Sequence, residues 1–184
     1  QRASARLADI LAEAHSRPAI DPAPLVPRPP EAIVLQALRL YAQGRGKAAA
    51  GDHQGAITDL DQATRLDPSA HEPWRELGDA QTAAGRRLAA IGSYTMACSR
   101  GSDDPRVWWI VGRDAIKSAQ TDKAVSLLAR AQELIADATD PALEYLVAAD
   151  LSEALLAQGR LRAAIESGAR AGAMPIPLPW ATRL

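Results

Sequence analysis

The sequence contains little of what disulfide-rich domains, metal sites and β-sheet cores are built from. Its 184 residues include one cysteine, Cys98, which excludes an intramolecular disulfide framework and a multi-cysteine metal site. There is no phenylalanine, and the aromatic residues are four tryptophans and three tyrosines, against 40 alanines. Because strands favour aromatic and β-branched residues and helices favour alanine, this composition predicts packed helices rather than a sandwich or barrel.

Charge of one sign and long apolar runs are also lacking. The 21 basic and 22 acidic residues are interspersed and leave a formal net charge of -1, which gives no overall field to attract nucleic acid or an anionic membrane. No run approaches the roughly 18 apolar residues of a membrane span, and the N-terminus lacks a basic-then-apolar signal peptide. We therefore expect no nucleic-acid partner and no membrane insertion.

The same features favour a soluble, cytoplasmic protein over an exported one. The chain begins at Gln1 without a methionine, so a targeting signal or further domains could have been removed. The sequence leaves the compartment open.

What the sequence does contain is a repeat of 34 residues. Small residues recur at this spacing through three copies, and a shift of six residues brings a fourth copy into register. The recurring small residues are Ala56, Ala90 and Ala124; Ala63, Ala97 and Ala131; Gly44, Gly78 and Gly112; and, in the fourth copy, Ser152, Ala164 and Ala171. A β-branched residue recurs with them at Ile57, Ile91, Val125 and Ile165.

Each copy has the pattern of two helices separated by a turn. In the third copy, Trp108 and Val111 have the i, i+3 spacing of one helical face. The second helix of the first copy then shows apolar residues at helical spacing, beginning with Ala56 and Ile57. Between the two helices, a break occurs at corresponding positions in the four copies: Gly51, Gly85, Ala119 and Gly159.

Local signals predict where these helices begin and end. Pro68 disfavours helix in the preceding residue and should end the second helix of the first copy. Asp104 is followed by Pro105, and proline is favoured at the first position of a helix, so Asp104 is the predicted N-cap. Ser69 and Glu72 have the spacing of a capping box, which predicts a helix start at Ser69.

Small residues also predict how the two helices of a copy pack. Antiparallel helices approach to about 8 Å only where no side chain stands between them. We expect Gly78 to face Ala90 across the second pair, while Trp74 and Tyr94 fill the space between pairs.

These residues resemble the tetratricopeptide repeat (TPR) family, whose unit is a 34-residue helix-turn-helix. The second copy carries the resemblance best, through Trp74, Leu77, Gly78, Ala90 and Tyr94 at the family's spacing. The resemblance implies an all-α fold of antiparallel helix-turn-helix repeats, three regular and a degenerate fourth. These repeats would stack in a right-handed superhelix with a concave groove.

The predicted organisation has three parts. A short helix and a proline-rich extended strap occupy residues 1–30, because residues 18–30 contain six prolines. The repeat array occupies residues 31–174 and ends in an extended apolar tail at residues 175–184. Its copies are expected at residues 37–70, 71–104, 105–138 and 145–174.

Three further expectations concern the ends of the copies and the strap. Residues 31–50 should form one long helix, and Asp140 with Pro141 should start the first helix of the fourth copy early. The strap is long enough to pack back on the repeats, and we expect it near Tyr41 and Trp109.

No catalytic, cofactor or metal site emerges from the residue spacing. His15, His53 and His71 lie in different predicted elements, and Cys98 is expected to be a small buried residue. Residues 44–46 contain two glycines but lack the Gly-Lys-Ser/Thr ending of a phosphate loop. We therefore expect a protein that is not an enzyme and that holds no cofactor or metal.

The resemblance selects residues that would face the groove. The third copy carries an aromatic ring beside three cations on one helical stripe, either a solvated basic face or an anchor for a peptide side chain or carboxylate. The Lys, Asn and Arg clamp of chaperone-binding family members is absent, because Glu76 and Ile110 are among the residues at its positions. The selected residues are Tyr41, Arg45, Arg75, Asp79, Arg106, Trp109, Arg113 and Lys117.

The function that the resemblance implies is a non-enzymatic interaction module or scaffold that presents the groove to a peptide or protein. Two alternatives remain. The chain could be a structural spacer or regulatory domain within a larger enzyme or signalling protein, or it could self-associate as a homodimer through its C-terminal repeat.

Overall fold

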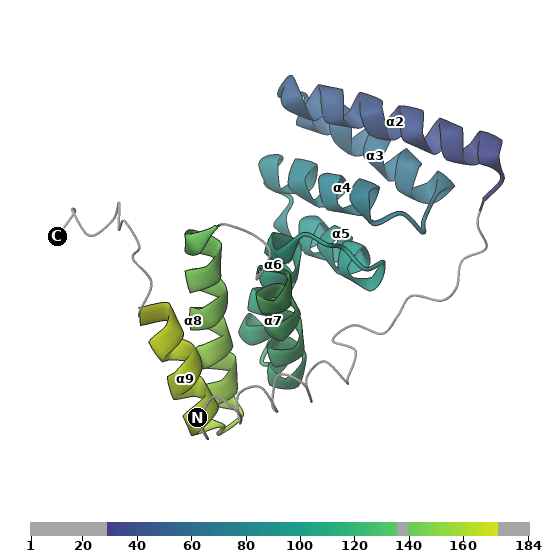
Figure 1. Ribbon diagram of the computed structural model, residues 1–184. Helices are drawn as coiled ribbons and strands as arrows, with labels where there is room; N and C mark the ends of the chain where they lie inside the picture. The colour runs from purple at the N-terminus through teal and green to yellow at the C-terminus, as the bar shows by residue number, and fades with distance from the viewer. Residues whose placement is uncertain (1–28, 136–139, 173–184) are drawn as a thin grey trace. The chain divides into compact units, whose positions relative to one another are not determined.

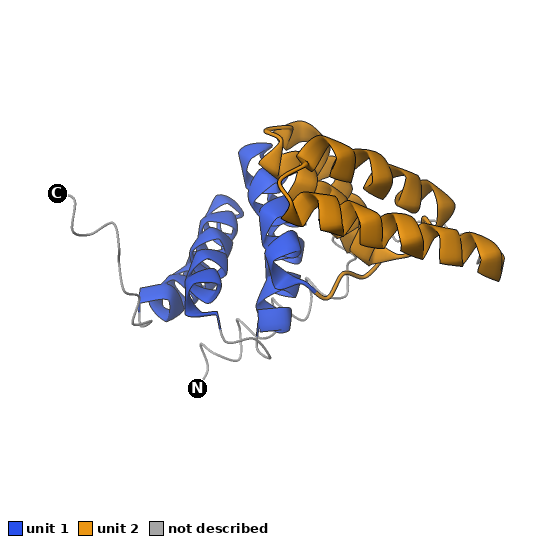
Figure 2. Cartoon of the chain, turned by 90° about the horizontal axis from the view of Figure 1, so that it is seen from above, with its two compact units in different colours: residues 1–19, 104–184 blue, residues 20–103 orange. Residues whose placement is uncertain are grey.

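A computed structural model describes residues 29–135 and 140–172 of the chain. In this part of the chain all regular structure is α-helical, and the helices follow one another in pairs joined by short turns (Figure 1). They fall into two compact units, coloured separately in Figure 2, and each unit contains two helix pairs. None of these helices is long and apolar enough to cross a membrane.

Within unit 2, each helix packs against the next along the chain. Helix α2 pairs with α3, α4 pairs with α5, and α3 joins the two pairs. Their bounds are α2 Glu31–Ala49, α3 His53–Leu66, α4 His71–Ala83 and α5 Arg87–Ser99.

Unit 1 repeats this arrangement. Helix α6 pairs with α7, α8 pairs with α9, and α7 contacts α8. Their bounds are α6 Pro105–Lys117, α7 Thr121–Ile135, α8 Pro141–Ala157 and α9 Leu161–Gly172.

The turns inside the pairs lie where the sequence predicts them and share a left-handed backbone conformation. The φ angles are +83° at Gly51, +75° at Gly85 and +73° at Gly159, which glycine adopts without steric cost. Ala119 occupies the same position in the third pair with a φ angle of 56°. A left-handed alanine costs about 1–2 kcal/mol, so this turn is held in place by the helices that it joins.

Most of the predicted helix ends are confirmed. Asp104 caps α6, because its Oδ1 accepts a hydrogen bond of 2.9 Å from the backbone N–H of Arg106. Asp140 caps α8 in the same way, and α2 forms the long helix expected there. Helix α3 ends at Leu66, two residues before Pro68.

The capping-box prediction is wrong. Helix α4 begins at His71 with Ala70 as its N-cap, and no side chain caps it. The Ser69 hydroxyl instead donates a 2.5 Å hydrogen bond to Asp67 Oδ1. Because Asp67 binds this hydroxyl in the loop, Ser69 serves the turn rather than the helix start.

Small residues line the contacts within the pairs, although one predicted contact is different. A Cβ added to Gly78 would lie 2.5 Å from the ring of Tyr94, and the nearest side chain is therefore Tyr94 rather than Ala90. Ala90 itself is buried, as is the predicted core residue Trp108. Cys98 is also buried, as expected.

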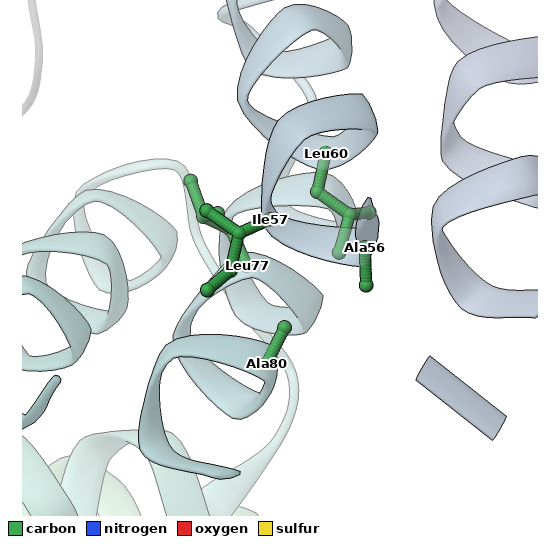
Figure 3. Close-up of a cluster of buried hydrophobic side chains, with 5 residues drawn as sticks. All are labelled: Ala56, Ile57, Leu60, Leu77 and Ala80. Atoms are coloured by element: carbon green, nitrogen blue, oxygen red, sulfur yellow. The ribbon is translucent and has the colours of Figure 1, made fainter. Parts of the chain in front are cut away.

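Between α3 and α4 a small apolar cluster joins the two pairs of unit 2. Figure 3 shows its side chains, which come from α3 and α4. Tyr41 and Trp74 pack on the cluster from outside. The cluster consists of Ala56, Ile57, Leu60, Leu77 and Ala80.

The predicted N-terminal helix, nearly all of the proline-rich strap and the apolar tail lie outside the described residues. The expected position of the strap near Tyr41 and Trp109 therefore remains a prediction.

Candidate functional site

Helix α2 presents an aromatic ring and a cation that contact each other. Tyr41 and Arg45 lie one turn apart, and the Arg45 guanidinium is 5.7 Å from the centroid of the Tyr41 ring. The Nε of Arg45 lies 3.6 Å from Oε1 of Glu76 in α4. The Arg45 side chain is 59% exposed, so the ring and the carboxylate fix its direction without burying it.

Helix α6 of unit 1 carries the same arrangement. The Arg113 guanidinium is 5.4 Å from the centroid of the Trp109 ring, and its Nε lies 3.9 Å from Oδ2 of Asp150 in α8. The indole N–H of Trp109 also donates a 2.7 Å hydrogen bond to Oδ2 of Asp150. Arg113 remains 49% exposed, whereas Asp150 is mostly covered.

We refer to these two sets as the aromatic–arginine–acid triads. Each joins the first helix of one pair to the first helix of the next, within one unit. Trp109 and Arg113 follow Tyr41 and Arg45 by two repeats. The triads therefore recur once every two helix pairs, rather than once in every repeat.

The other predicted site residues are placed differently. Arg75 donates a 3.0 Å hydrogen bond to Oε1 of Glu76, which ties it to the triad of unit 2. Asp79 accepts a 2.7 Å hydrogen bond from the Tyr94 hydroxyl of α5. Arg106 lies 3.4 Å from Asp104, at the start of α6, and Lys117 is exposed at the end of that helix.

The described residues contain no group of three or more histidine, cysteine or acidic side chains placed to hold a metal ion. His53 is half-buried, and His71 lies 3.8 Å from Glu72. His15 is outside the described part of the chain.

Comparison with known proteins gives matches at the level of structure alone. No protein-family model and no curated protein matches the sequence. Among solved structures, the chain is similar to YrrB, described as a TPR protein with an unusual peptide-binding site. The TM-score is 0.59 at 20% identity, over 73% of this chain and 66% of YrrB. The described helices have the TPR fold.

Two further structures share this TPR fold with the chain. One is the Yersinia enterocolitica type III secretion chaperone SycD in complex with a peptide of the translocator YopD. Its TM-score is 0.52 at 24% identity, covering 65% of this chain and 92% of SycD. The other is MamA, with a TM-score of 0.55 at 18% identity over 73% of this chain and 70% of MamA.

The TPR pattern does not predict the acidic residue of each triad. Glu76 and Asp150 occupy the same position in the first helices of the second and fourth repeats. The signal for them was an acidic residue at this position in alternate repeats, matched to an arginine in the preceding repeat. This alternation has a period of two repeats, so it is not part of the 34-residue pattern.

Proposed function

We propose that this chain is a non-enzymatic interaction module that binds a peptide or protein segment on the faces of its first helices. The observation that carries the proposal is the pair of triads, in which an exposed arginine is held against an aromatic ring. Arginine, tryptophan and tyrosine contribute most to binding at protein interfaces. An arginine already held in place loses less conformational entropy when it binds.

The chemistry of the triads supports a polar anchor in the partner. The carboxylate approaches each arginine at Nε, and the side chains of Arg45 and Arg113 remain 59% and 49% exposed. A guanidinium edge of this kind binds a carboxylate or a main-chain carbonyl. The peptide held by SycD and the peptide-binding site of YrrB support a bound segment as the class of partner.

Selection of displayed peptides on the full chain, followed by calorimetry, tests this function. The double variant Arg45→Ala, Arg113→Ala should lose about tenfold or more in affinity for the selected peptides. The matched control, Arg65→Ala with Arg162→Ala, removes two exposed arginines from second helices and should bind as the parent does. Equal affinity of both double variants, or no selected peptide, would refute the proposal.

Self-association is a second candidate, and one observation favours it. The last helix pair exposes Leu156 by 56%, Leu161 by 58% and Ile165 by 61%. Exposed apolar side chains that cluster often mark a protein interface. If this face forms a homodimer, light scattering of the full chain should show a dimer that Leu161→Ser with Ile165→Ser converts to a monomer.

A further inference from the structure

Helices α2 and α4 and the loop before α4 surround a cavity of about 190 Å³ in unit 2. Its apolar walls include Leu38, whose side chain is 54% exposed, and Tyr41 of the triad. Ala37, Ala70 and Pro73 complete these walls. Sites for whole small-molecule ligands have volumes of roughly 300–1,000 Å³, so this cavity is of the size that takes one side chain.

Two carboxylates complete the lining of the cavity. They belong to Asp67 and Glu72. Asp67 Oδ1 accepts hydrogen bonds from Ser69, and Oε1 of Glu72 lies 3.8 Å from Nε2 of His71. Neither carboxylate pairs with a lysine or arginine in the part of the chain that the structure describes. An apolar cavity therefore lies beside two carboxylates that no lysine or arginine of the described residues neutralises.

From this arrangement we infer that the cavity binds an aliphatic side chain of a partner segment that carries a lysine or arginine close to it. The inference rests on the proposed function and specifies the chemistry of the partner. A purely apolar segment would cover Asp67 and Glu72 without pairing them, which costs free energy. A cation next to the aliphatic residue replaces the lost water and excludes segments with acidic neighbours.

Two pools of labelled synthetic peptides test the inference on the full chain. Each peptide has one leucine and one charged residue one to four positions away, lysine in one pool and glutamate in the other. Fluorescence anisotropy should show about tenfold tighter binding of the lysine pool, and this preference should weaken as sodium chloride is raised. Equal binding of the two pools would overturn the inference.

Three variants locate the effect. Glu72→Lys should reverse the preference from lysine to glutamate, and Leu38→Ser should weaken binding of both pools. The matched control Glu153→Lys adds the same charge to an exposed position of α8 and should leave the preference unchanged. Circular dichroism establishes that each variant is folded. A preference unaffected by Glu72→Lys would also overturn the inference.

One other occupant of the cavity would be recognised in the same experiment. A dimer that Leu38→Ser dissociates would show that a second copy fills the cavity, and this result overturns the inference. If the selected peptides depend on Arg45 and Arg113 but not on Glu72 and Leu38, the inference fails while the proposed function stands.

Discussion

A Cβ added to Gly168 of α9 would lie 3.1 Å from the hydroxyl oxygen of Ser152 in α8. In the preceding pairs the glycine is on the first helix and the larger residue is on the second. The contacts are Gly44 with Leu60, Gly78 with Tyr94, and Gly112 with Leu128. The fourth pair exchanges the two sides, so the helices need one small residue at this contact but not on a particular helix.

The exchange predicts coupling between the two positions. Gly168→Leu should lower the free energy of unfolding by about 1–3 kcal/mol, because the new side chain meets Ser152. Adding Ser152→Gly restores the glycine–leucine arrangement of the other pairs and should recover part of the loss, with a coupling of about 0.5–3 kcal/mol. Urea denaturation of the parent, the two single variants and the double variant measures this coupling energy. Strictly additive losses of unfolding free energy would contradict the exchange.

Gly78→Ala should destabilise the protein by about 1–3 kcal/mol. The added Cβ would lie 2.5 Å from the rigid ring of Tyr94. The Tyr94 hydroxyl donates a hydrogen bond to Asp79, so the ring cannot easily move away. Gly92→Ala is the control, because nothing lies within 4 Å of its Cβ and alanine favours helix by about 0.5–1 kcal/mol. Opposite shifts of the denaturation midpoint are expected, and a shift of the same sign in both would show that the Tyr94 contact is unimportant.

Ala119→Gly should stabilise the turn between α6 and α7. Replacing a left-handed alanine relieves about 1–2 kcal/mol of strain, partly offset by the greater freedom of glycine in the unfolded chain. A net gain of about 0.5–1 kcal/mol is expected. Gly159→Ala, at the corresponding turn of the fourth pair, should lose a similar amount, and thermal unfolding of both variants gives the comparison.

Ala90→Leu should cost about 1–3 kcal/mol, since Ala90 is buried and a larger side chain overpacks the second helix pair. Its neighbour Ala89 is exposed, so Ala89→Leu should change the unfolding free energy by less than about 0.5 kcal/mol. Equal denaturation midpoints for the two variants would refute this assignment of the helix faces.

Asp150→Ala should release both Trp109 and Arg113. Losing a charged hydrogen-bond acceptor at this half-buried site should lower the free energy of unfolding by about 1–2 kcal/mol. Tryptophan emission should shift to the red as the Trp109 indole becomes more exposed, and Trp109→Phe should remove that shift. Glu153→Ala, on the exposed side of α8, is expected to change neither quantity.

Much of the fold could be predicted because its determinants are local or strictly periodic. The turn at Gly85, the end of α3 before Pro68 and the cap at Asp104 each depend on a few adjacent residues. The burial of Trp108 follows from its position in the repeat. These features can be predicted without knowing which helices contact each other.

The features that the sequence did not predict correctly depend on competition between neighbouring groups or on contacts between repeats. Ser69 had the right spacing for a cap, but its hydroxyl donates a hydrogen bond to Asp67, and α4 begins at His71 without a side-chain cap. Asp150 is 41 residues from Trp109, so no local pattern joins them. Partner binding by the predicted site residues requires groups of another molecule, which the spacing of residues in this chain does not encode.

Each triad joins two successive helix pairs. A rearrangement of the chain that keeps a triad intact must therefore move two helix pairs together. A chain shortened after α7 would keep Trp109 and Arg113 but lose Asp150, whereas one shortened after α5 would keep Tyr41, Arg45 and Glu76 together. Inserting a single pair after α3 would place a different residue opposite Arg45. An engineered array should therefore be lengthened by copying α2–α5 or α6–α9 whole.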